Sequence, residues 1–172
     1  DGHDTDGVTD YAIERMRGLE KSEKPFCMFV AHQAPHPVCQ APEEYRRMYK
    51  DKDLHWRENS VYEQDFRGYG TECDSREFLE EYLAEVTHLD AALGRLLDEL
   101  ESLGLADDTI VVFTSDHGEM ASSHGLYEKR VMYEEDMHVP LITRVPGQEG
   151  GQIVEGLFSS VDFLPTLLDI CG

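Results

Sequence analysis

The pattern of hydrophobic and polar positions predicts one long amphipathic helix in the middle of the chain. Across residues 76–103, leucines and one valine recur at intervals of three and four positions, which places them along one helix face. Asp74 with Glu77 resembles a capping box at its start, and Gly104 is suited to end it. We expect this helix to contribute packing rather than chemistry. Its apolar stripe consists of Leu79, Leu83, Val86, Leu89, Leu93, Leu96 and Leu100.

Two short runs of apolar and β-branched residues predict buried strands. Residues 26–31 and 109–114 have the composition of strands that are covered on both faces, as in a parallel sheet. Residues 139–145 predict a weaker strand that ends at Pro146, and residues 148–158 predict a turn with another short strand.

Shorter helices are predicted around these strands. Apolar spacing predicts a helix at 9–20, residues 43–49 are able to wind after a proline-rich loop, and Ser159 with Asp162 opens a final helix. Pro165 is tolerated there because it lies in the first turn. The alternation of helices and strands predicts an α/β fold, with a partial, mixed but mostly parallel sheet flanked by helices.

Residues 51–75 follow no clear pattern and are interpreted as an insertion or loop. Long loops inside compact domains are often functional, so the aromatic and basic residues at 55–69 are candidates to line a sugar or aryl pocket. A disordered excursion is the alternative, and the sequence does not decide between the two.

The charge narrows the classes of partner. The chain has 172 residues, enough for one domain, and a formal net charge of −21. Such a surface repels nucleic acid and anionic membranes, and an anion site on it needs local positive charge, which a metal ion supplies best. Solubility or a salty habitat is the plainer explanation for most of these carboxylates.

The four cysteines do not identify a metal site or a compartment. They stand at positions 27, 39, 73 and 171, without the close pairing of a zinc site. A disulfide between any two is neither indicated nor excluded by the spacing. The location, whether periplasmic, extracellular or cytoplasmic, stays open.

Asp116 and His117 directly follow the predicted strand at 109–114. Ligands of open α/β sheets bind beyond the carboxyl ends of strands, and an aspartate with a histidine supplies an oxygen and a nitrogen ligand for a divalent cation. The alternative is an ordinary turn, which aspartate and Gly118 also favour.

His36 and Lys129 are the further candidates at this rim. His36 stands between two prolines after the strand at 26–31, and Lys129 lies downstream of Asp116. A lysine there is suited to a charged oxygen of a substrate. An incidental loop histidine and a solvated surface lysine are the alternatives.

Several motifs in order resemble the sulfatase family of the alkaline phosphatase superfamily. They are KPFCMFVAHQAPHP with QAPEEY, the YLAEVTHLD helix, TSDHGEM with HGLYEK, YEE and HVPLI, and the final SSVDFLPTLLD. The resemblance covers nearly the whole chain apart from 51–73.

This resemblance implies roles for individual residues. Asp116 and His117 would bind the divalent cation, with Ca²⁺ favoured over Mg²⁺ or Mn²⁺. Lys129 would contact the sulfate, and His36 would contact it or protonate the leaving group. His124 lies in a matching segment and is taken as a substrate-binding candidate without a defined role. The chain reads PHPV where many relatives read PHTP, so the His36 loop is expected to differ slightly.

The family's remaining parts have no match in the sequence. The two adjacent metal-binding aspartates and the CxPxR or SxPxR segment, whose Cys or Ser becomes the formylglycine nucleophile, are absent, and none of the four cysteines fits. The smaller C-terminal subdomain is absent too. Residues 1–172 are therefore interpreted as the C-terminal part of a sulfatase catalytic domain, inactive alone.

The full-length enzyme is expected to hydrolyse a sulfated sugar or an aryl or alkyl sulfate. A phosphatase or phosphonate monoester hydrolase of the same superfamily is the alternative, and a non-catalytic module is another. We expect no nucleic-acid or membrane partner, and a homodimer through an exposed sheet edge or apolar face is one predicted assembly.

Overall fold

The structure is a computed structural model that describes residues 3–19, 21–37, 40–61, 65–68 and 71–172. Within these residues, no helix is both long and apolar enough to cross a membrane.

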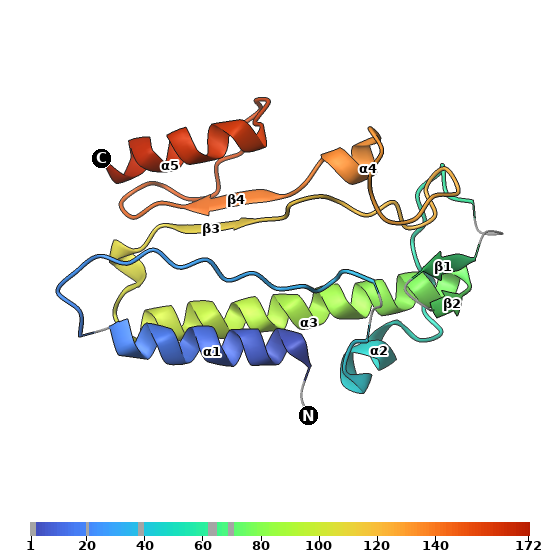
Figure 1. Cartoon of the computed structure of the whole chain (residues 1–172), viewed down its shortest axis with the longest axis horizontal. Helices are drawn as coiled ribbons and strands as arrows, with labels where there is room; N and C mark the ends of the chain where they lie inside the picture. The colour runs from blue at the N-terminus through green and yellow to red at the C-terminus, as the bar shows by residue number, and fades with distance from the viewer. Residues whose placement is uncertain (1–2, 20, 38–39, 62–64, 69–70) are drawn as a thin grey trace.

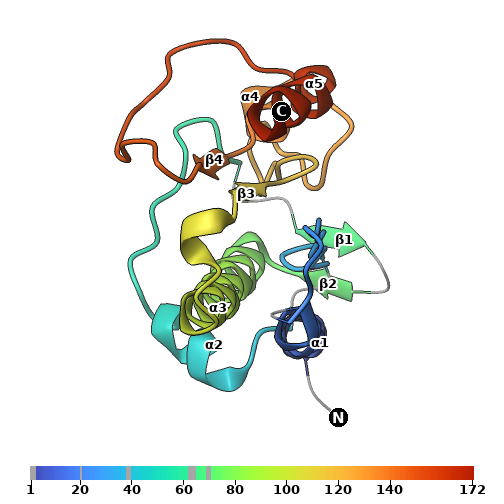
Figure 2. The same ribbon diagram turned by 90° about the vertical axis from the view of Figure 1, so that its left-hand side faces the viewer.

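Helices lie on both sides of a layer of extended chain (Figure 1). Helices α1 (Asp4–Leu19) and α3 (Ser75–Ser102) lie side by side below this layer, and α5 (Phe163–Cys171) lies above it. Strands β3 (Val111–Thr114) and β4 (Leu141–Arg144) lie in between, and Figure 2 shows the same three layers end-on. This layering confirms the α/β fold predicted from the sequence.

α1 packs against α3, and small residues rather than the predicted leucine stripe are among the most deeply buried on the two helices. Thr9 and Ala12 of α1 and Ala84 and Ala92 of α3 are all almost completely buried. Of the seven stripe residues, only Leu100 is fully buried, and the others are half-buried or exposed. Small side chains let the two helix axes approach closely.

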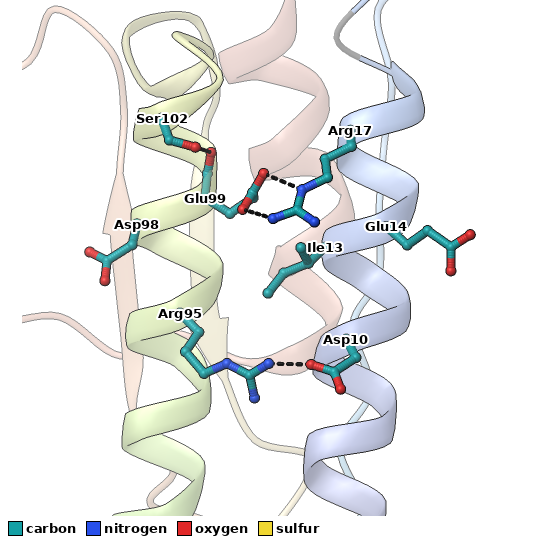
Figure 3. A pocket seen from close by; sticks show the side chains of 8 residues that line it. All are labelled: Asp10, Ile13, Glu14, Arg17, Arg95, Asp98, Glu99 and Ser102. Atoms are coloured by element: carbon teal, nitrogen blue, oxygen red, sulfur yellow. Dashed lines mark hydrogen bonds and ion pairs between the residues drawn. The ribbon is translucent and has the colours of Figure 1, made fainter.

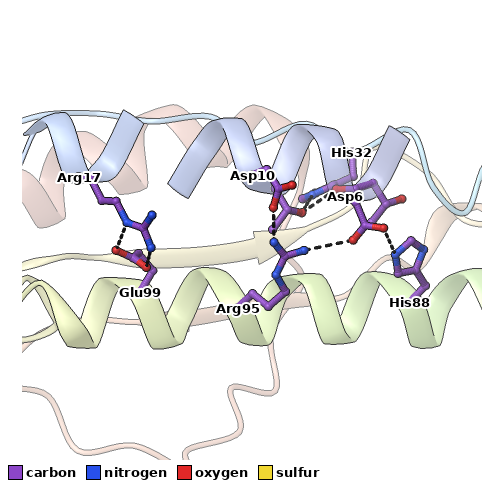
Figure 4. A network of polar contacts seen from close by, with 9 residues as sticks. Asp6, Asp10, Arg17, His32, His88, Arg95 and Glu99 are labelled. Atoms are coloured by element: carbon purple, nitrogen blue, oxygen red, sulfur yellow. Dashed lines mark hydrogen bonds and ion pairs between the residues drawn. The ribbon is translucent and has the colours of Figure 1, made fainter. Parts of the chain in front are cut away.

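Ion pairs line the edge of this contact (Figure 4). Arg17 donates to Glu99 through Nε at 2.8 Å and Nη2 at 2.7 Å. Arg95 donates to Asp6 at 3.1 Å, and Nε2 of the buried His88 lies 3.3 Å from the same carboxylate. α1 begins at Asp4, earlier than the predicted residue 9, because Asp6 and its neighbours provide polar partners for α3 and negative charge at the helix start.

The strands pair differently from the prediction. β3 and β4 are antiparallel, with Val111 opposite Arg144 and Thr114 opposite Leu141. Residues 26–31 are extended, but they are not a strand, because they do not pair with a neighbouring strand among the described residues. In the described chain, β4 is the only strand that pairs with β3. This extended segment nevertheless runs in the same direction as β3 (Figure 1).

Part of the irregular stretch is an ordered hairpin. After α2 (Glu43–Tyr49), β1 (Phe66–Gly68) pairs antiparallel with β2 (Thr71–Cys73). Phe66 is buried, and its ring lies 4.9 Å from that of Phe78 and 5.5 Å from that of Tyr127. These aromatic contacts fasten the hairpin to α3 and to the loop after β3. Residues 62–64 and 69–70 lie outside the described residues.

The C-terminal part is exposed. Residues 148–158 contain no strand, contrary to the prediction, and each of them is exposed. A single extended run without a neighbouring strand has no hydrogen-bonded ladder. The final helix is confirmed: Ser159 and Asp162 form a capping box before α5. α5 itself has no buried residue.

Candidate functional site

The loop after β3 places Asp116 and His117 side by side. Asp116 is 86% exposed at its side chain, and its Oδ2 lies 3.6 Å from Nε2 of His117. His117 Nδ1 lies 2.8 Å from the carbonyl oxygen of Gly118. Because a carbonyl only accepts, Nδ1 carries the proton of the neutral ring and Nε2 keeps its lone pair. A carboxylate oxygen and an imidazole nitrogen therefore face one another, which fits two ligands of one divalent cation.

The same residues also form the turn that the alternative interpretation expects. Asp116 Oδ1 accepts from the backbone N–H of His117 at 3.0 Å, and Ser115 Oγ donates to the His117 carbonyl at 2.8 Å. The turn and the ligand pair are compatible, because Asp116 keeps Oδ2 for another partner. Among the described residues, no group of three or more His, Cys, Asp or Glu is arranged to hold a metal.

His36 and Lys129 are brought together by the fold. They are 93 positions apart, yet Lys129 Nζ lies 2.8 Å from His36 Nε2, and both side chains are half-buried. His36 Nδ1 faces the carbonyl oxygen of Pro37. Because an ammonium only donates and a carbonyl only accepts, His36 is the tautomer protonated on Nδ1, with Nε2 as the acceptor for Lys129.

The layer of extended chain explains how His36 and Lys129 come together. The extended segment at 26–31 and β3 run in the same direction, so the chain leaves both at the same end of the layer (Figure 1). The loop that carries Lys129 lies at that end as well. His36 contacts Lys129, and Asp116 contacts His117. That the two pairs converge on one pocket stays a prediction.

His124 has a different set of partners. Its Nε2 lies 3.0 Å from Asn59 Nδ2, and its ring stacks on Tyr133 with centroids 4.1 Å apart. Asn59 also donates to Glu135 at 2.7 Å, and this hydrogen bond holds the pKa of Glu135 below its usual range. Arg57 lies 3.5 Å from the same carboxylate. The irregular stretch thus packs against the loop after β3, and a substrate role for His124 stays a prediction.

Sequence reasoning missed Glu119, whose carboxylate Oε1 accepts from the backbone N–H of Ala121 at 3.1 Å and of Glu128 at 2.6 Å. Burial raises the pKa of Glu119, against the opposing effect of these two hydrogen bonds. In the sequence, Glu119 is followed by Met120 and Ala121, and this pattern does not predict that its carboxylate accepts from backbone N–H groups.

A separate cleft of about 530 Å³ lies between α1 and α3 (Figure 3). Its two arginines point at carboxylates of the facing helix: Arg17 at Glu99 and Arg95 at Asp10. Each of these two arginines therefore already has a carboxylate partner on the facing helix.

Known proteins resemble this chain over nearly its whole length. The family model described as Sulfatase matches residues 1–172. Mouse arylsulfatase K (Mus musculus) is 33% identical over 189 aligned residues, which cover 95% of this chain and 34% of that protein. The chain therefore spans about a third of the length of this relative.

Solved structures show the same similarity. A phosphonate monoester hydrolase from Silicibacter pomeroyi is similar with a TM-score of 0.82 at 27% identity, covering 98% of this chain and 38% of that one. A protein in complex with its substrate D-glucosamine-2-N,6-O-disulfate has a TM-score of 0.78 at 26% identity, covering 98% and 48%. With a family model matching from end to end, this chain belongs to the sulfatase family of the alkaline phosphatase superfamily.

Proposed function

We propose that this chain forms part of the active site of a sulfuric ester hydrolase. The observation that carries the proposal is the 2.8 Å contact between Lys129 Nζ and His36 Nε2. In a chain with a net charge of −21, a half-buried ammonium held against a histidine is a local positive site for an anionic group.

The two residues would act on the sulfate ester in different ways. Lys129 donates hydrogen bonds and balances negative charge that builds on the sulfate oxygens in the transition state. His36 Nε2 accepts from Lys129 in this structure, so it takes up a proton before it can hydrogen-bond the sulfate or protonate the leaving oxygen. Its Nδ1 contact with Pro37 keeps the ring oriented meanwhile.

Asp116 and His117 would hold a divalent cation, with Ca²⁺ favoured and Mg²⁺ or Mn²⁺ as alternatives. When bound, the cation would polarise sulfate oxygens and stabilise an oxyanion. Calcium takes about six to eight ligands, mostly oxygens, so these two side chains would complete its shell rather than form it. The nucleophile would be a formylglycine supplied from outside these 172 residues.

The proposed substrate class is a sulfated sugar or an aryl or alkyl sulfate. Similarity to a protein solved with a disulfated glucosamine favours a sulfated glycan. A phosphonate monoester hydrolase is the second candidate, because the Silicibacter pomeroyi enzyme has the same fold and a phosphonate presents a similar tetrahedral oxyanion.

Hydrolysis of a chromogenic aryl sulfate and of an aryl phosphonate monoester by the full-length protein tests the proposal. We expect faster hydrolysis of the sulfate, and a loss of about 100-fold or more in kcat with Lys129→Ala, as for removal of one oxyanion-stabilising donor. Lys50→Ala, which removes an exposed lysine after α2, is the matched control and should leave kcat unchanged.

Each other outcome identifies an alternative. Preferential hydrolysis of the phosphonate would select the second candidate. Absence of turnover of both esters in a folded, metal-loaded protein would support a non-catalytic module.

A further inference from the structure

The backbone around Lys129 adopts an uncommon conformation. The residues on either side of it, Glu128 and Arg130, have φ angles of +65° and +84°. Non-glycine residues in the left-handed region cost free energy and persist where the surrounding structure imposes them. The contacts on each side of Lys129 show what imposes them here.

Glu119 fixes the backbone that precedes Lys129. Its Oε1 accepts from the Glu128 N–H at 2.6 Å and from the Ala121 N–H at 3.1 Å. The Met120 N–H donates to the Glu128 carbonyl at 3.0 Å. Both polar groups of the Glu128 backbone therefore have partners on the segment that begins with Glu119.

Asp136 fixes the backbone that follows Lys129. It is only 6% exposed, and its Oδ2 accepts from the Val131 N–H at 2.8 Å. The Asp136 carbonyl accepts from the Gly118 N–H at 2.8 Å. A Cβ atom on Gly118 would lie 1.9 Å from the Glu135 carbonyl oxygen, so a glycine is required where these segments cross. Asp136 thus joins the backbone after Lys129 to Gly118, in the loop that follows β3.

We infer that Glu119 and Asp136 are positioning residues that set where the Lys129 ammonium meets His36. A lysine side chain has four rotatable bonds. Its ammonium group can therefore be held in one place only if the backbone that carries it is also held in place. Both carboxylates act on peptide N–H groups, and their effect on the anion site passes through Lys129. The functional part of this inference rests on the proposed roles of His36 and Lys129.

The test reads the His36 ring directly, so it does not depend on sulfatase turnover. The ¹⁵N signals of the ring, measured by NMR in the histidine-labelled protein, report its tautomer and the hydrogen bond at Nε2. Lys129→Ala defines the signal when the contact is lost. We expect Glu119→Ala to move His36 toward that signal, and Glu119→Gln, which keeps an oxygen acceptor, to stay close to the wild type.

A kinetic double-mutant cycle adds a readout that general loosening would not give. We expect Glu119→Ala to lower kcat/KM about 10- to 100-fold alone, as for a misplaced catalytic group, and to cause almost no further loss in the Lys129→Ala background. Independent losses that multiply would overturn the inference.

Further variants decide the remaining cases. Glu99→Gln removes a carboxylate contact between α1 and α3, and it should leave the His36 signal unchanged. If Glu119→Ala does not fold, Glu119→Asp, which keeps the charge but withdraws the oxygen, replaces it and should move His36 in the same direction. A His36 signal that stays at its wild-type position, or moves equally in Glu99→Gln, would overturn the inference. If Glu119→Ala loses the His36 contact but neither the wild type nor any variant hydrolyses the esters, the proposed function is refuted and the positioning role still stands.

Discussion

Cys73 stands at the end of β2, beside the acidic start of α3. Burial raises the pKa of its thiol to about 11 from a reference of 9.0, and the carboxylates of Glu77 and Asp74 add to this shift. Cys27 and Cys171 are exposed, in contrast. Because the thiolate is the nucleophile, the surroundings of Cys73 suppress its reactivity.

We therefore expect iodoacetamide to label Cys73 more slowly than the two exposed cysteines at pH 8. A pKa two units above the reference leaves about a hundredfold less thiolate at that pH. The rate at Cys73 should rise with pH up to about 11, which peptide mapping by mass spectrometry can follow. Equal labelling of Cys73 and Cys27 at pH 8 would contradict the expectation.

At the residue scale, the sequence was most informative where chemistry depends on side-chain type. A resemblance in motifs pointed to both His36 and Lys129, and the structure shows their contact. Glu119 could not be found in this way. Its carboxylate accepts from the N–H of Glu128, a residue with a positive φ, and no local pattern in the sequence encodes that turn.

At the element scale, α3 depends on how its first turn is capped. Asp74 lies just before the helix, and its Oδ1 accepts from the Glu77 N–H at 2.8 Å. This bond satisfies one of the backbone donors that a helix start leaves without a partner in the helix.

Asp74→Ala should lower the free energy of unfolding by about 1 kcal/mol, because the Glu77 N–H loses its acceptor. Asp74→Asn retains an oxygen acceptor and should cost much less. Urea unfolding of both variants measures the difference, and equal losses would show that charge rather than capping matters at this position.

The sequence predicted helices better than strands. α3 follows from a local repeat with Asp74 and Gly104 at its ends, and Gly104 indeed has a φ of +68°. The apolar run at 26–31 has strand composition, but strand formation needs a partner, and no strand pairs with it among the described residues. The β1–β2 hairpin was missed because its strands have only three residues each.

At the scale of the whole molecule, net charge and exposed apolar side chains have opposite effects on association between copies of the chain. The net charge of −21 keeps copies of the chain apart. Large apolar side chains are nevertheless exposed along the C-terminal part, where none of the described residues covers them. They are Ile153, Val154, Leu157, Phe158, Val161, Leu164 and Leu168. Exposed apolar surface favours association.

The isolated 172-residue chain is therefore expected to bind an apolar dye, to self-associate more as salt increases, and to show no aryl sulfatase turnover. Salt screens the repulsion between acidic surfaces, whereas the apolar contact persists. Replacing Leu164 and Leu168 together by Gln should reduce dye binding and association. Tyr11→Ser is the matched control, since Tyr11 and Leu164 are both 65% exposed but Tyr11 lies on α1. Light scattering measures self-association and fluorescence measures dye binding. A chain that stays monomeric and binds no dye at high salt would show that this surface does not drive association.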